Sequence, residues 1–117
     1  MLSKEKIEKL RKIAERYNIE KIILFGSYAK GEETKKSDID LIFVKNTKRR
    51  FLDRIDFFLK KISVFLKGEI NLFVYTPEEF EEMKKYSRFI NNILKEAEII
   101  YESGKTKKGS IAVVKAS

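Results

Sequence analysis

The sequence predicts an α/β fold (α+β in broad class): an α/β sandwich in which helices flank one small mixed sheet. Short apolar runs bounded by polar residues or glycine are typical of buried strands, and longer stretches with apolar residues at helical spacing alternate with them. The predicted order is helix, strand, loop, strand, helix, strand, helix, strand, which favours a single layered domain. At 117 residues the chain is long enough for one hydrophobic core and too short for several functional modules.

The first half of the chain contains two predicted helices and two predicted strands. A helix is expected over residues 3–18, where apolar residues recur at helical spacing and Ser3 can cap the N-terminus. Strands are expected over residues 21–25 and 39–44, on either side of a polar loop. A second helix is expected over residues 51–68, which end in a glycine. Its predicted apolar face consists of Phe51, Leu52, Ile55, Phe58, Leu59, Ile62, Phe65 and Leu66.

The second half repeats the alternation. A third strand is expected over residues 70–75. A helical pattern follows over residues 76–97, with Thr76 and Glu79 spaced as a capping box at its start. Residues 98–102 predict a closing strand.

The composition restricts the available chemistry. There are 26 Lys and Arg against 18 Asp and Glu, a net charge of +8 that favours polyanionic partners such as nucleotides, nucleic acids or acidic protein surfaces. Cysteine and histidine are absent, which excludes disulfides, the usual zinc ligands and His-based acid–base catalysis. Any metal must therefore be bound by oxygen, which suits magnesium or manganese. No stretch resembles a membrane span or a signal peptide, so we expect a cytoplasmic protein.

Two short motifs lie where the first two predicted strands meet the polar loop. Gly26-Ser27 closes the first strand, and Asp38-Ile39-Asp40 opens the second. Residues two apart on a strand share a face, so both aspartates point the same way while Ile39 enters the core. Two carboxylates held side by side repel each other unless a cation lies between them, and a divalent metal meets that need.

The residues around the Gly-Ser pair suit a phosphate. Glycine lets the backbone turn sharply, and Ser27 adds a hydroxyl and an N–H at the start of a short helical turn. Lys30, Lys35 and Lys36 lie in the same loop and add positive charge. These groups indicate a site for a metal-bound nucleoside triphosphate. Either motif alone is usually structural, but their combination across the ten-residue spacer 28–37 is much more specific.

The segment FGSYAKGEETKKSDIDLIFV resembles the signature of the DNA polymerase β-like nucleotidyltransferase superfamily. Within it, the chain is similar to the minimal nucleotidyltransferases of prokaryotes, and the spacing matches the motif of MntA-type antitoxins, whose partners are HEPN-domain toxins. The resemblance implies a polymerase β-like nucleotidyltransferase domain over residues 1–103. A basic, flexible C-terminal tail over residues 104–117 would fall outside it.

The resemblance also implies a role for each motif residue. Gly26 and Ser27 would hold the triphosphate of ATP, with Lys30 as a further candidate. Asp38 and Asp40 would coordinate two magnesium ions, or manganese ions, that stabilise in-line displacement of pyrophosphate. In MntA-like proteins the acceptor is a tyrosine hydroxyl on the toxin, which is thereby adenylylated and silenced.

One residue departs from the family pattern. The family places a third carboxylate on the third strand, where it binds the catalytic metal and helps to deprotonate the attacking hydroxyl. The aligned residue here is Asn71, whose neutral amide is a poorer metal ligand and no general base. Glu69 lies two residues earlier on the same strand face and is the alternative source of a carboxylate. The other interpretation is a solvated strand end and weak or absent catalysis.

Three functions therefore stay open at the level of sequence. The first is an ATP-dependent protein adenylyltransferase that acts as an antitoxin. The second is an antitoxin that binds nucleotide or protein without chemistry, because of Asn71. The third, an RNA-binding or RNA-end nucleotidyltransferase, rests on net charge alone, since no interleaved aromatic and basic motif for base stacking is present. Phe57 and Val64, on the outer side of the helix predicted over residues 51–68, form a candidate ridge for docking a protein partner.

Overall fold

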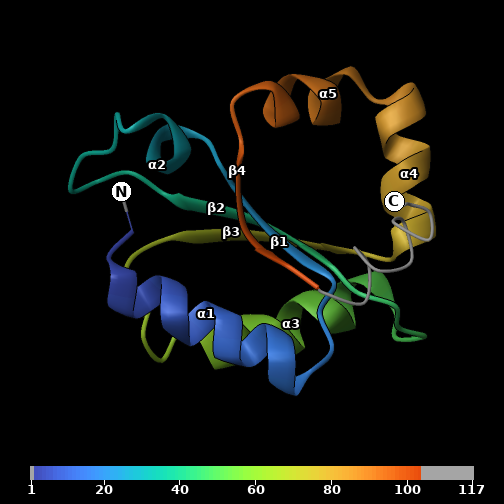
Figure 1. Ribbon diagram of the computed structural model, residues 1–117, viewed down its shortest axis with the longest axis horizontal. Coiled ribbons are helices and arrows are strands. Elements are labelled where there is room, and N and C mark those ends of the chain that lie inside the picture. Colours follow the sequence, from blue (N-terminus) through green and yellow to red (C-terminus); the bar gives the residue numbers. More distant parts are fainter. Residues whose placement is uncertain (1, 104–117) are drawn as a thin grey trace, which may run out of the picture.

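The computed structural model describes residues 2–103 and confirms the predicted architecture (Figure 1). One four-stranded mixed sheet has the strand order β3-β2-β1-β4. Strand β2 is parallel to β3, whereas β1 is antiparallel to both of its neighbours. The tail expected over residues 104–117 lies outside the described residues. The strands are β1 (Lys21–Phe25), β2 (Ile39–Val44), β3 (Ile70–Tyr75) and β4 (Glu98–Glu102).

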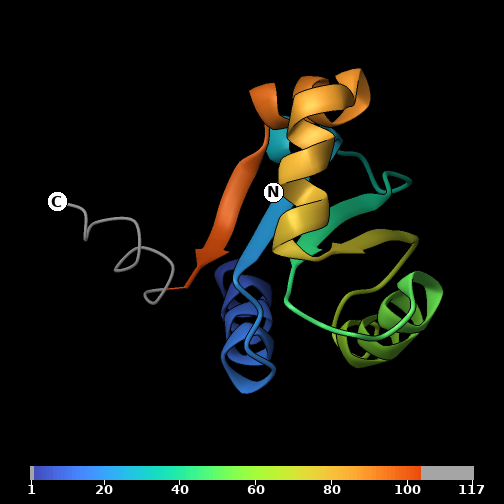
Figure 2. The same cartoon turned by 90° about the vertical axis from the view of Figure 1, so that its right-hand side faces the viewer.

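Helices cover both faces of the sheet. Helices α1 and α3 pack on one face and α4 and α5 on the other, with the short α2 at the end of β1 (Figures 1 and 2). None of these helices combines the length and the apolarity that crossing a bilayer requires. Their bounds are α1 (Lys4–Arg16), α2 (Ser27–Lys30), α3 (Phe51–Ile62), α4 (Pro77–Tyr86) and α5 (Arg88–Lys95).

The alternation of side chains along β2 divides them between two cores. Ile39, Leu41 and Phe43 lie in the larger core, under α1 and α3. Ile42 and Val44 lie in the smaller core, under α4 and α5. Asp40 shares this second face, because residues two apart on a strand point the same way. The predicted aspartates therefore belong to the α4/α5 side of the sheet.

Two predicted helix caps are confirmed. Ser3 Oγ accepts a hydrogen bond from the Lys6 N–H at 3.2 Å. Thr76 Oγ1 accepts from the Glu79 N–H at 3.1 Å, while the Glu79 carboxylate accepts from the Thr76 N–H at 2.9 Å. Satisfying these otherwise unpaired N–H groups fixes where α1 and α4 begin.

The helix predicted over residues 51–68 is shorter than expected, and its apolar face is wrong at its first two positions, Phe51 and Leu52, which are both exposed. Helix α3 ends at Ile62, and the chain continues in turns. Leu52, expected in the core, is 74% exposed, whereas Arg54 is buried. A buried guanidinium is stable only when it is paired, and that of Arg54 donates to both oxygens of the Glu79 carboxylate, at 2.7 and 3.3 Å.

The helical pattern predicted over residues 76–97 is broken at Ser87. The backbone there is extended, with φ −101° and ψ 115°, and the Ser87 hydroxyl accepts a hydrogen bond from the Ile90 N–H. A serine can compete with the helix in this way because its side chain satisfies nearby backbone groups. The same residue therefore ends α4 and caps α5, and α5 takes a different direction across the sheet (Figure 1).

The docking ridge predicted on α3 does not form. The ring of Phe57 meets that of Tyr17 edge-on with centroids 5.4 Å apart, and the Arg49 guanidinium and the Lys61 ammonium lie over it. Phe57 thus belongs to the packing between α1 and α3. Val64 is 75% exposed in the turn after α3, so it does not share a helix face with Phe57.

Candidate nucleotide and metal site

Three polar side chains meet at one end of the sheet. In the parallel register of β2 and β3, Asp40 lies opposite Asn71, and across the antiparallel pair it lies opposite Phe25 at the end of β1. Asp38 directly precedes β2 and shares the face of Asp40. The end of β1 and the beginnings of β2 and β3 therefore bring the two predicted motifs to one place.

Asn71 joins the two aspartates. Its Nδ2 donates a hydrogen bond to Asp38 Oδ2 at 3.2 Å and another to Asp40 Oδ1 at 2.8 Å. Asp38 and Asn71 are exposed, and Asp40 is half-buried. The carboxylates thus converge on one point that solvent can reach. The structure agrees with the predicted shared face and adds a role for Asn71 that the sequence did not reveal.

Gly26 stands where no other residue fits. Its φ of +72° and ψ of −154° belong to a region that only glycine adopts readily. A Cβ at this position would lie 2.2 Å from Asp40 Oδ2, so the backbone passes directly against the carboxylate. A side chain here would displace Asp40 before it reached any bound phosphate.

The predicted phosphate-binding residues Ser27 and Lys30 follow Gly26 in α2. They do not both point toward the aspartates. Ser27 is the first residue of α2 and is half-buried. Lys30 ends α2, and its ammonium pairs with the Glu96 carboxylate at 3.2 Å. In this arrangement Lys30 ties α2 to the end of α5.

The loop that leads into the aspartates has its own internal structure. Ser37 Oγ accepts a hydrogen bond from the Thr34 N–H at 2.8 Å, and the Thr34 carbonyl accepts from the Ser37 N–H at 3.1 Å. This closed turn delivers the chain to Asp38. Sequence reasoning missed it, although a Thr and a Ser three residues apart in a polar loop are the usual signal of such a turn.

Glu69 lies beside the aspartates in register, but its carboxylate does not join them. It is exposed and precedes β3, where its backbone carbonyl accepts a hydrogen bond from the Ile39 N–H at 2.9 Å. Within residues 2–103, no three acidic side chains are grouped closely enough to hold a metal ion. The donor set at this site is two carboxylates and one amide.

This donor set fits a hard divalent cation. Magnesium prefers oxygen ligands and is commonly bound by one or two carboxylates together with substrate phosphates. Asp38 and Asp40 already direct one oxygen each at the same amide nitrogen, which is the arrangement a shared cation needs. These two residues would hold the metal.

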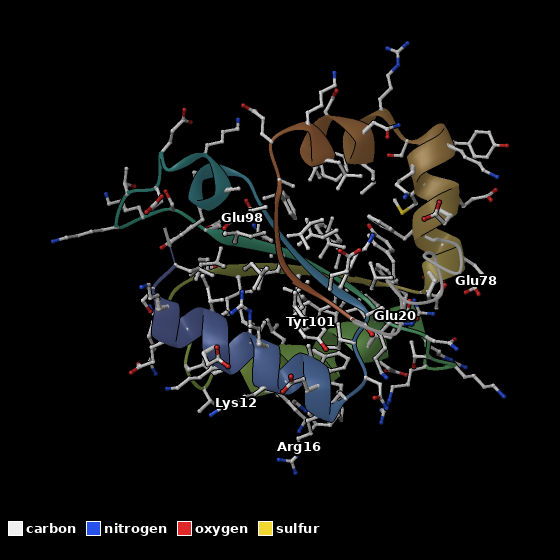
Figure 3. All side chains as sticks on the ribbon, viewed as in Figure 1. Lys12, Arg16, Glu20, Glu78, Glu98 and Tyr101 are labelled. Atoms are coloured by element: carbon white, nitrogen blue, oxygen red, sulfur yellow. The ribbon has the colours of Figure 1, made fainter. Side chains whose placement is uncertain are left out.

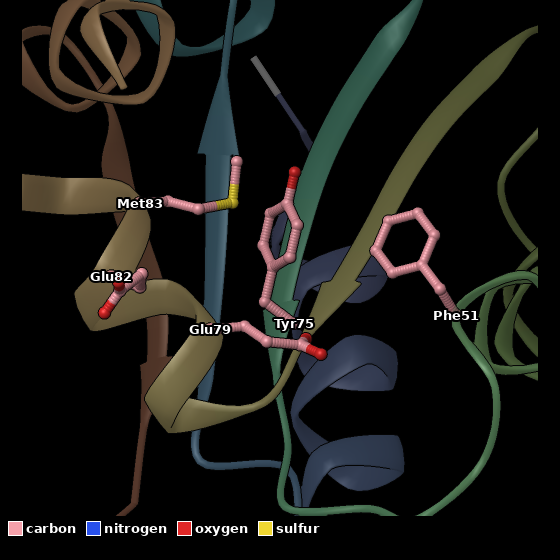
Figure 4. Close-up of a pocket in the computed structure, with 5 residues that line it drawn as sticks. All are labelled: Phe51, Tyr75, Glu79, Glu82 and Met83. Atoms are coloured by element: carbon pink, nitrogen blue, oxygen red, sulfur yellow. The ribbon is translucent and has the colours of Figure 1, made fainter. Parts of the chain in front are cut away.

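A separate pocket of about 260 Å³ lies at the other end of β3 (Figure 4). Burial, and after it the charge of Glu79, raise the pKa of Tyr75, so its phenol stays neutral at physiological pH. Tyr75 is four residues beyond Asn71, or about 13 Å along the strand. The pocket is therefore distinct from the aspartate site. It is lined by Phe51, Tyr75, Glu79, Glu82 and Met83.

Part of the positive charge lies on the face of the sheet opposite to the aspartates. Lys12 and Arg16 project from α1 away from the sheet (Figure 3), on the face opposite to Asp40. In the part of the chain that the structure describes, four other basic side chains pair with an acid on the same helix, as Lys60 does with Asp56 at 3.1 Å. These basic residues thus belong to solvated helix surfaces.

The mixed sheet, the Gly-Ser turn and the paired aspartates define a nucleotidyltransferase. The family model described as Polymerase beta, Nucleotidyltransferase matches residues 8–106, and the chain belongs to this family. The family and the enzyme class predicted from the sequence are confirmed.

Two similar proteins of Methanocaldococcus jannaschii are each named "Putative protein adenylyltransferase". One is 38% identical over 87 residues, which cover 74% of this chain and 82% of the relative. Another is 41% identical over 64 residues, which cover 50% of this chain and 64% of the relative.

Solved structures share the fold at low sequence identity. A toxin–antitoxin structure with AMP-PNP has a TM-score of 0.63 and 17% identity, over 87% of this chain and 77% of the other. A chain in the structure of the tri-AMPylated Shewanella oneidensis HEPN toxin in complex with MNT antitoxin has a TM-score of 0.56 and 12% identity. The match covers 98% of this chain and 86% of the other. These matches confirm the predicted fold.

Proposed function

We propose that this chain transfers AMP from ATP to a hydroxyl group of a partner protein, a tyrosine of a HEPN toxin, and so acts as an antitoxin. The observation that carries the proposal is the convergence of Asp38 and Asp40 beside the Gly26 backbone. The name of the relative that is 38% identical supports a protein acceptor, and the toxin–antitoxin complexes among the structural neighbours support a HEPN partner. The proposal assigns this activity to residues 1–103.

The proposed reaction makes one bond to phosphorus, breaks another, and releases one proton. The acceptor oxygen bonds to the α-phosphorus of ATP, and the bond from that phosphorus to the oxygen bridging the α- and β-phosphates breaks, so pyrophosphate leaves. The hydroxyl proton passes to Glu69 or to water. Asp38 and Asp40 would hold magnesium or manganese, which supplies neutralisation of the phosphate charge when bound.

The turn after β1 would bind the triphosphate. Gly26 allows its backbone to approach closely, and Ser27 offers a hydroxyl and an N–H at the start of α2. Lys30 can join them because its ion pair with Glu96 is exposed. Such pairs contribute only about 0–1 kcal/mol, so a triphosphate can readily replace Glu96 as the partner of Lys30.

The double variant Asp38→Asn/Asp40→Asn tests the assignment. It removes both anionic ligands, so magnesium-dependent ATP binding and transfer of labelled AMP to a HEPN partner should both be lost. The matched control is Asp53→Asn/Asp56→Asn on α3, which removes the same charge from the opposite face of the sheet and should transfer normally. Undiminished magnesium-dependent ATP binding in the first variant would rule out this site.

Glu69→Gln tests the proposed proton acceptor. A general base contributes about 10²–10⁴-fold in rate, so transfer should fall by that amount while ATP binding is retained. Single-turnover transfer of labelled AMP separates the two effects. A rate equal to that of the wild type would mean that water takes the proton.

A second candidate function is an antitoxin that binds nucleotide and toxin without transferring AMP. Asn71 favours it, because the amide stands where the family has a third carboxylate and cannot act as a base. Intact binding of ATP and of the HEPN partner, with no label transferred by the wild type, would select this function.

A further inference from the structure

The Asn71 amide occupies the point on which both aspartates converge. Its nitrogen lies 3.2 Å from Asp38 Oδ2 and 2.8 Å from Asp40 Oδ1. A carboxamide NH₂ group has two N–H donors, and both are used here. Because ionised carboxylates only accept hydrogen bonds, the amide must turn its nitrogen toward them rather than its oxygen. The Asn71 amide thus bridges the two aspartates.

The site carries less negative charge at this point than a site with three carboxylates would. Asp38 and Asp40 supply two negative charges, Asn71 supplies none, and Glu69 does not complete a group of three. A divalent cation that binds here must turn or displace the amide, which then offers only a neutral oxygen. Two carboxylates balance the charge of one such ion, so a second ion would depend on the nucleotide for its anionic ligands.

We propose that Asn71 limits this site to one tightly bound divalent cation per nucleotide and keeps Asp38 and Asp40 in place when the cation is absent. The inference rests on the proposed function, because it takes the two aspartates as the metal-binding residues. Asn71 is then a positioning residue that acts through the carboxylates it touches. Of the two ions that the family resemblance implies, the second is the weakly bound one.

Asn71→Asp tests the metal stoichiometry, with Asn92→Asp as a charge-matched control. Asn92 is exposed on α5, so this change adds the same negative charge outside the site. Free Mn²⁺ is measured by electron paramagnetic resonance during titration of the full chain with a non-hydrolysable ATP analogue, and the analogue alone is the reference. We expect one bound Mn²⁺ in the wild-type and Asn92→Asp complexes and two in Asn71→Asp, with affinity for the second ion at least about tenfold higher.

Thermal unfolding in EDTA gives a readout that needs neither nucleotide nor transfer. Three carboxylates at one point repel one another, so Asn71→Asp should unfold at a lower temperature than Asn92→Asp. Adding Mn²⁺ should raise the unfolding temperature of Asn71→Asp by more than that of the control, because the ion binds the folded state.

Three results would overturn the inference. The inference is wrong if the wild-type protein transfers AMP and binds two Mn²⁺ ions with equal affinity, a result that would leave the proposed function intact. An Asn71→Asp variant that binds one Mn²⁺ and unfolds like Asn92→Asp would overturn the inference as well. A wild-type chain that binds neither Mn²⁺ nor the analogue would contradict both the inference and the proposed function.

Discussion

The two faces of the sheet differ in what their side chains do. Under α1 and α3, strand β2 contributes Leu41 and Phe43, both fully buried in the larger core. Under α4 and α5 the same strand begins with Asp40, half-exposed beside Asn71, before its apolar residues resume. Along β2 the first face is apolar over its whole length, whereas the second has polar groups in place of apolar contacts at one end.

Along this one strand, residues that stabilise the core therefore alternate with residues of the candidate site. A substitution at Phe43 acts on folding, and one at Asp40, three residues away, acts on the site, because odd and even positions face opposite layers. Three substitutions test this comparison. The first two each have a control on the same chain, and the third is tested by its dependence on pH.

Phe43→Ala should have the largest effect on stability. The Phe43 ring is fully buried, and its centroid lies 5.5 Å from that of the Phe58 ring. Truncating such a buried ring to alanine costs about 3–5 kcal/mol of stability. Phe73→Ala removes the same side chain from the α4/α5 face, where the ring is half-exposed, and should cost about 1–2 kcal/mol. Urea unfolding measures both, and equal losses would contradict the distinction between the faces.

Gly26→Ala should come next, with an effect on both stability and binding. Strain at its φ of +72° costs about 1–3 kcal/mol, and the new Cβ would displace the Asp40 carboxylate. Gly31→Ala is the matched control, because its φ is +71° but its Cβ would meet nothing within 4 Å. Both variants should lose stability, whereas only Gly26→Ala should weaken ATP binding, measured by calorimetry. Equal ATP affinity in the two variants would show that Gly26 serves only the turn.

Glu79→Gln should have the smallest effect, and one that depends on pH. Glu79 of α4 pairs with Arg54 of α3 and so joins the layers on the two faces; a hydrogen bond from Arg54 is the main cause that lowers the pKa of Glu79 below its ordinary 4.5. The Glu79 side chain is 44% exposed, so solvent screens the pair and we expect a loss of about 1 kcal/mol at pH 7.

The sign of the pH dependence follows from the lowered pKa. The ion pair stabilises the folded state fully above pH 4.5, and this contribution is lost as the pH falls through 4.5 toward the lowered value. The difference in unfolding temperature between wild type and Glu79→Gln should therefore shrink below pH 4.5. A difference that stays constant down to pH 3 would show that the pair carries no net stabilisation.

Local patterns predicted the strands, the caps and the face shared by the aspartates. Alternation along residues 39–44 was enough to place Asp38 and Asp40 together, because strand geometry leaves no other arrangement. The Thr76 capping box is equally local, since both of its hydrogen bonds span three residues.

What the sequence could not reveal depends on partners distant along the chain. Arg54 interrupts an apolar stripe, and only the position of Glu79, 25 residues later, explains its burial. Asn71 looked like a missing carboxylate, and its hydrogen bonds to the aspartates became visible only with the register of β2 and β3. The break at Ser87 depends on a competition between two helical directions that apolar spacing does not report.

We expect the β2–α3–β3 crossover to delay the assembly of the site during folding. Asp40 and Asn71 are 31 positions apart, so their contact requires a long loop to close, whereas β1 and β2 pair across a short connection. A nascent chain that has emerged only as far as α3 carries both aspartates with nothing to hold them together. Recovery of nucleotide binding after dilution from denaturant would therefore time the docking of β3, a late kinetic step that backbone spectroscopy alone would not separate from the rest.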